Sequence, residues 1–347
     1  MKIYRPDSLN QVWLGFVLIH IVGSTVLVMA MGYAMGIILI NSLLWGYIAY
    51  ENRKEKAGIF LSALGWSLSL FLLSRMPFAY RTAFMMNMVL FCFLLFIYFG
   101  RIRWIRQRTC IGLIGGRDIL YILAFTILFL VMAEFINAVS MLVFHNYVAD
   151  SLASIRQNLW AGILVFAAAP AAAEEILFRG YLFERLGNGW KAVLISSLLF
   201  ALGHMNFNQM CYAFTMGFLF AAVFRFTGNL SYTMVIHFLF NLYSVLMSAF
   251  AESTFAKWIS DIHIFEYHPF YATFQGVSGS AFGMALAVGC FFFLLALSLT
   301  LLLLFHLRKK KGKEAEKTGI EPDWRTGISF FIGAALCLII AITQEIL

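Results

Sequence analysis

The sequence predicts an all-α protein, a polytopic transmembrane helix bundle of about 11 spans, and three observations support this fold class. Of the 347 residues, 62% are hydrophobic and only 12% are charged, whereas an ordinary soluble domain carries about 25% charged residues. A soluble globule has too little interior to hide so much apolar surface. The 37 Phe and 16 Met suit lipid-facing and helix-packing positions, and the five Pro argue against a loop-rich or all-β chain.

The expected spans follow from length, because a helix needs about 20 apolar residues to cross the hydrocarbon core of a bilayer. In chain order they are residues 11–31, 33–50, 58–74, 82–100, 118–144, 159–183, 191–205, 211–226, 231–250, 280–306 and 327–347. The longest connection between them is residues 251–279. We therefore expect no soluble domain between the spans.

The chain divides into three parts by the content of these spans. Residues 1–117 form an N-terminal four-span extension that ends in a basic linker. Residues 118–250 form a five-span core with nearly all of the polar residues at membrane depth, and residues 251–347 form an outer loop and two closing spans. No inverted repeat of the kind that marks many transporters is apparent, which argues against a transporter.

Lys and Arg are distributed unequally between the two sides of this topology. With a cytoplasmic N-terminus, the inner segments hold twenty of the 25 basic residues and the outer segments hold four. Cytoplasmic loops carry the excess of Lys and Arg in membrane proteins, so we expect the N-terminus inside. An anionic inner leaflet then accounts for the net charge of +8, and we expect no nucleic-acid partner.

Three charged residues lie within one predicted span, in the run AAAEEILFRGYLF. A charge at mid-membrane costs at least about 2.5–3.5 kcal/mol on insertion scales, so it is by default a functional hypothesis. Glu175 and Arg179 are four residues apart and share a helix face, which predicts an ion pair. Glu174 is rotated about 100° from Glu175, and its carboxylate is expected to point elsewhere.

Two further spans carry polar pairs with the same spacing. FALGH places Phe200 and His204 on one face, and HFLFN does the same for His237 and Asn241. A carboxylate, two imidazoles and a carboxamide in a cavity of low dielectric make a hydrolytic set. Glu174 is the expected general base, with His204 sharing the water. His237 and Asn241 are suitable donors to the oxyanion that forms when water attacks an amide.

Structural roles for the same residues weigh against this interpretation. An intramembrane His more often makes an interhelical hydrogen bond than acts in catalysis, and Glu134 is expected to make an interhelical contact. The coincidence of three polar motifs in three spans within 70 residues favours a site.

Together, EEILFR, FALGH and HFLFN resemble EExxxR, FxxxH and HxxxN/D, the three motifs of the CPBP intramembrane protease (Abi) family. This family includes the type II CAAX prenyl endopeptidases and bacterial proteins linked to bacteriocin processing and self-immunity. The resemblance covers about residues 118–250 and not residues 1–117. It implies an endopeptidase that cuts a peptide bond in or near the membrane.

Carried over by motif, the resemblance makes Glu174 the water-activating residue, assisted by His204. Glu175, Arg179 and Phe200 would support the site, while His237 and Asn241 would bind the oxyanion. Members are often labelled metalloproteases, and Glu174, His204 and His237 offer three ligands that zinc accepts. The sequence contains no HExxH motif, and a metal-free mechanism is favoured.

A non-catalytic scaffold of the same fold that binds a sensor kinase or an export partner is the main alternative. A pure scaffold has no reason to bear the insertion cost of the polar residues. We expect an integral protein of a bacterial plasma membrane, acting on a peptide, a membrane protein or a surface protein.

Overall fold

The computed structural model describes Trp13, Val17, Ser67 and most of residues 111–315 and 328–346. The gaps within these ranges are residues 154–157, 184–185, 188, 252, 255–256, 259–260, 262–266, 270–273 and 275. Apart from those three isolated residues, the four spans predicted in residues 1–117 lie outside the described residues.

The described part of the chain is helical and contains no β-strand, which confirms the all-α class. Its elements are α7 (Gly116–Ser140), α8 (Tyr147–Ala153), α9 (Leu159–Gly162), η2 (Ile163–Ala168), α10 (Ala169–Glu175), η3 (Ile176–Leu182), α12 (Trp190–Leu202), α13 (Phe207–Thr227), α14 (Leu230–Ala249), α16 (Gly279–Ala315) and α17 (Ile328–Ile346), where η denotes a π-helix.

Five helices of the described part are long and apolar enough to cross a membrane. They are Gly116–Ser140, Leu159–Gly180, Phe207–Thr227, Leu230–Ala249 and Gly279–Lys309, close to the predicted spans. Helix α12 has 13 residues and is therefore about 20 Å long, shorter than the roughly 30 Å hydrocarbon core. The predicted span 191–205 is thus a short helix followed by a turn.

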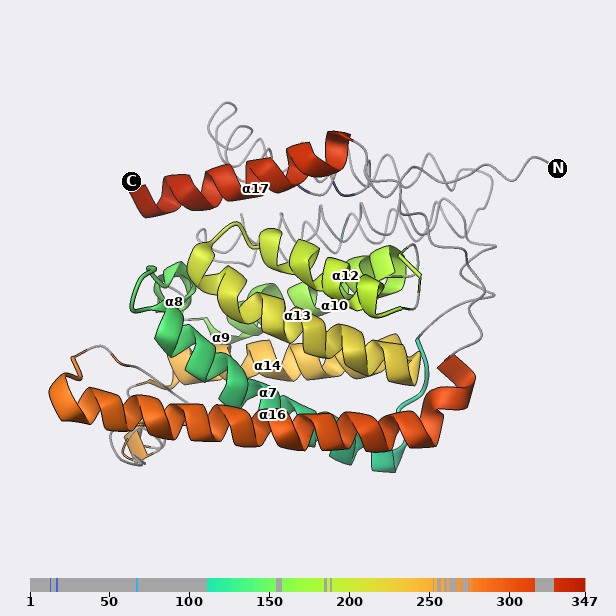
Figure 1. Ribbon diagram of the computed structural model, residues 1–347, viewed down its shortest axis with the longest axis horizontal. Helices are drawn as coiled ribbons and strands as arrows, with labels where there is room; N and C mark the ends of the chain where they lie inside the picture. The colour runs from blue at the N-terminus through green and yellow to red at the C-terminus, as the bar shows by residue number, and fades with distance from the viewer. Residues whose placement is uncertain are drawn as a thin grey trace.

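The long helices lie side by side with their axes roughly aligned (Figure 1). Helices α7, α13, α14 and α16 share one apolar core, which includes Phe125, Phe129, Phe220 and Ile236. A second core joins η3, α12, α13 and α17 with Trp13. Helix α13 contributes to both cores, so it holds the two halves of the described bundle together.

The span that carries the charged motif is not a uniform α-helix. Two π-helical segments, η2 and η3, flank the short α10, and Pro170 lies in the first turn of α10. Proline has no N–H to donate and its ring crowds the preceding turn, so a locally wider helix relieves the clash. Because π-helical segments occur frequently at functional sites, this irregularity directs attention to Glu174 and Glu175.

Two tight turns set the positions of α13. Between α12 and α13, Met205 takes the left-handed conformation with φ 53°, and the Asn206 side chain accepts a hydrogen bond from the backbone N–H of Gln209. A non-glycine residue with positive φ is uncommon and is often found at functional sites. After α13 the chain reverses at Gly228, whose φ of 60° suits glycine.

Candidate active site

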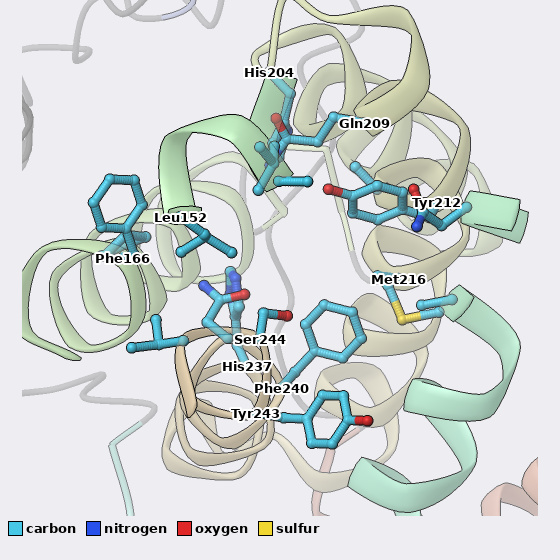
Figure 2. Close-up of a pocket in the computed structure, with 18 of the residues that line it drawn as sticks. Leu152, Phe166, His204, Gln209, Tyr212, Met216, His237, Phe240, Tyr243 and Ser244 are labelled. Atoms are coloured by element: carbon cyan, nitrogen blue, oxygen red, sulfur yellow. The ribbon is translucent and has the colours of Figure 1, made fainter. Parts of the chain in front are cut away.

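A cavity of about 640 Å³ lies within the bundle. Figure 2 shows side chains from α8 (Leu152), η2 (Phe166), α13 (Gln209, Tyr212 and Met216) and α14 (His237, Phe240, Tyr243 and Ser244) around one space. The residues that line it include Glu174, His204, His237 and Asn241. The fold therefore brings together the four residues predicted from three separate motifs.

Glu175 and Arg179 form the buried ion pair that their spacing predicts. Arg179 Nη1 donates to Glu175 Oε1 at 2.8 Å, and both side chains are fully buried. Arg179 Nη2 donates to the carbonyl of Gly217 on α13 at 2.9 Å. The guanidinium also lies 4.5 Å from the centre of the Phe200 ring, so charge, hydrogen bonds and a cation–π contact together compensate its burial.

Gly217 allows this arrangement because there is no room for a side chain at its position. A Cβ built there would lie 3.0 Å from Phe200 Cδ1, 3.2 Å from Ser197 Cα and 3.4 Å from Arg179 Nη2. The absence of a side chain lets α12 and α13 approach closely, and it lets the Gly217 carbonyl reach Arg179. No sequence motif pointed to this glycine.

His237 links the ion pair to the cavity. Its Nδ1 lies 3.1 Å from Glu175 Oε1 and its Nε2 lies 3.8 Å from Glu174 Oε2. Since a carboxylate only accepts hydrogen bonds, Nδ1 carries a proton and donates it to Glu175. The ring stacks on Phe220 with centroids 5.0 Å apart. Glu175, which is paired with Arg179, therefore contacts and orients His237, in addition to any effect on Glu174.

Glu174 is the carboxylate of the motif that faces the cavity. Its side chain is 19% exposed, whereas that of Glu175 is fully buried. Within the described part of the chain, the buried Oε2 atom has no hydrogen-bond partner. A buried carboxylate oxygen without a partner costs free energy, so Glu174 is poised to bind a polar group that enters the cavity.

His204 lies just beyond the C-terminus of α12 rather than on the helix. Its Nδ1 lies 2.7 Å from the carbonyl oxygen of Phe200, and the two rings are 4.8 Å apart. Because a carbonyl accepts, Nδ1 carries the proton and the lone pair of the neutral ring is on Nε2. Phe200 and His204 lie side by side as predicted, with their rings edge to face, but His204 reaches this position from a turn after the helix.

Polar residues outside the three motifs also line the cavity, and among them Glu134 on α7 carries a carboxyl group. Asn137, three residues further along α7, accepts hydrogen bonds from Asn208 at 3.1 Å and Asn146 at 3.3 Å, so it is an interhelical contact. Gln209 and Tyr212 complete this side of the cavity. A carboxyl group within a predicted span distinguished Glu134 in the sequence, but the sequence alone could not show that its helix turns it toward the cavity.

The zinc set considered from sequence is not assembled. Among the described residues, no group of three His, Cys, Asp or Glu side chains is placed to hold a metal ion. His204 Nδ1 is bound to a backbone carbonyl, and both ring nitrogens of His237 face carboxylates.

Fold and site together define a helical protein with membrane-spanning helices, in which glutamate, histidine and asparagine side chains line one cavity. Residues 156–243 match the family model of the type II CAAX prenyl endopeptidase Rce1-like proteins. The matched segment is about a quarter of the chain and contains all three motifs. It confirms the resemblance of this part of the chain to the CPBP family. No curated protein and no solved structure matches the chain.

Proposed function

We propose that this protein is an intramembrane endopeptidase that hydrolyses a peptide bond with water activated by Glu174 and His204. The observation that supports this most directly is the contact between the cavity-facing Glu174 and His237, whose Nε2 lies 3.8 Å away. Both residues belong to the segment that matches the Rce1-like family. The cavity lies within the helix bundle, where polar interactions are stronger than in bulk water.

The first chemical step is the formation of hydroxide from one water molecule. Glu174 accepts a proton from the water, and the Nε2 lone pair of His204 accepts a hydrogen bond from the same water and orients it. The oxygen attacks the peptide carbonyl carbon, and the π electrons of the carbonyl move to its oxygen. Glu174 then gives its proton to the departing amine nitrogen as the C–N bond breaks.

The oxyanion of the tetrahedral intermediate is stabilised by His237 and Asn241. The Nδ1–H of His237 is committed to Glu175, so Nε2 donates to the oxyanion only when the ring is cationic. The hydrogen bond from His237 to Glu175, which is itself paired with Arg179, gives these two residues a role in orienting the His237 ring.

The proposed mechanism uses no metal ion. The alternative is a zinc ion held by Glu174, His204 and His237, which requires these side chains to move from the positions they have in the structure. Cleavage by purified protein is measured before and after treatment with a strong chelator. Unchanged cleavage supports the metal-free mechanism. Loss of cleavage that zinc restores would overturn it in favour of a metalloprotease.

The proposed location is a bacterial plasma membrane, and the substrate is a peptide, membrane protein or surface protein. The test compares protein N- and C-termini in cells with wild type, Glu174→Ala or His204→Ala at matched membrane levels. New termini present only with the wild type establish proteolysis and name the substrate.

The same experiment separates the protease from the scaffold. Identical termini in all three strains, with a cellular phenotype that Glu174→Ala retains, would reject proteolysis. That result would support a non-catalytic membrane scaffold that binds a sensor kinase or an export partner.

A further inference from the structure

The two ends of the described bundle differ in charge. Basic residues lie at the start of α7 and of α12, near the end of α13, and at the end of the apolar part of α16. Because the helices alternate in direction, these four places lie at the same end of the bundle (Figure 1). These residues are Arg117, Lys191, Arg225, Arg308 and Lys309. At the opposite end the only described Lys or Arg is Lys257.

The cavity extends to the end with few basic residues. Its lining includes residues in or beside the chain reversals at that end, namely Asn146, Gly203, Gln209, Ser248 and Ala251. None of the basic residues at the other end lines it. The positions of the lining residues along α7, α13 and α14 thus place the mouth of the cavity away from the basic end.

Positive charge decides which end is cytoplasmic, because short cytoplasmic loops are enriched in Lys and Arg. We propose that the cavity opens on the non-cytoplasmic side of the membrane and takes a peptide segment from that side. The substrate class rests on the proposed proteolytic function, whereas the direction of opening does not. A cytosolic C-terminal tail would meet the basic end of the bundle and not the cavity.

The charge of the cavity agrees with this substrate class. Two glutamates, Glu134 and Glu174, line it, and no Lys or Arg is among the lining residues. A free terminal carboxylate would find no Lys or Arg there and would lie near two other carboxyl groups. The cavity therefore suits an internal stretch of an exported or membrane-anchored chain better than an anionic chain end.

Cysteine labelling tests the direction of opening without using activity. In a variant with all five cysteines replaced by Ala, single cysteines are introduced as Ala251→Cys at the mouth and Lys191→Cys at the basic end. Both positions are exposed. We expect a membrane-impermeant maleimide to label Ala251→Cys in intact spheroplasts and Lys191→Cys only after permeabilisation.

The reverse pattern, or labelling of Lys191→Cys in intact spheroplasts, would overturn the proposal. Ser248→Cys provides a second position at the mouth, and failure of both mouth positions to label in intact spheroplasts also overturns it. A matched series in the Glu174→Gln background shows that the result does not depend on catalysis.

A second measurement separates this inference from the proposed function. Once a substrate is known, a bulky impermeant maleimide is added to intact spheroplasts that carry Ala251→Cys or Lys191→Cys. We expect cleavage to fall only with Ala251→Cys. Labelling as expected, together with identical protein termini in wild-type and Glu174→Ala cells, would reject the protease and leave the direction of opening established.

Discussion

The span Leu159–Gly180 and the helix α16 are both long enough to cross a membrane, yet they are built in opposite ways. The first is interrupted by π-helical segments, carries three charged residues and packs against α14. Helix α16 is one continuous helix whose outer face exposes large apolar side chains, such as Leu302 and Phe305. Charge is tolerated in the first span because neighbouring helices supply partners, which lipid cannot do.

The largest expected effect is the loss of the general base. Glu174→Gln keeps the shape of the side chain but cannot accept the proton, so we expect kcat to fall by about 10²–10⁴-fold. Thr300→Val in α16 is the matched control, because Thr300 is buried and its Oγ1 has no described partner. Equal loss of cleavage in both variants would show that the effect of Glu174→Gln is not specific to the charged span.

Removal of a donor to the oxyanion has the next largest effect. Asn241→Ala should lower kcat by about 10²–10³-fold with little change in KM, because the donor acts only in the transition state. Steady-state cleavage of a fluorogenic peptide measures both constants. Ser244→Ala, at another lining position of α14, is the control; an equal fall in kcat there would argue against a specific role for Asn241.

Breaking the buried ion pair should affect stability. Glu175→Ala or Arg179→Ala leaves an unpaired buried charge and is expected to cost about 3–5 kcal/mol of the free energy of unfolding. Thermal unfolding in detergent measures it. We expect the double variant to be less destabilised than the sum of the single variants. Strict additivity would mean that the two residues do not act as a pair.

A smaller stability effect is expected where α12 and α13 approach. Gly217→Ala places a methyl group against Phe200 and Ser197, and overpacking of this kind costs about 1–3 kcal/mol. Gly283→Ala in α16 is the control, because a Cβ there meets nothing within 4 Å. An unchanged melting temperature for Gly217→Ala would contradict the close-packing account.

The smallest effect concerns substrate choice. Glu134→Gln removes one of the two carboxyl groups that line the cavity, and it should lower kcat/KM about tenfold for peptides with Lys or Arg near the cut, equivalent to 1.4 kcal/mol. Peptides without a basic residue should be cleaved at the wild-type rate. A uniform loss over both peptide sets would indicate a structural role for Glu134.

Much of the site could be predicted from local spacing. The four-residue interval between Glu175 and Arg179 was sufficient to predict their ion pair, which the structure confirms. The contact between Glu175 and His237 was not predictable, since 62 residues separate them. Likewise, the turn that carries His204 depends on the conformation of Met205, which hydropathy does not encode.

The sequence by itself determined the helical class, the membrane location of the spans and the motifs that carry the polar residues. These depend on composition and on periodicity, which act over one helical turn or one bilayer thickness. Only the tertiary structure decided that Glu174 faces the cavity while Glu175 holds His237, and that Gly217 lets two helices meet. Those features depend on how helices pack, because the partners of a buried charge come from distant parts of the chain.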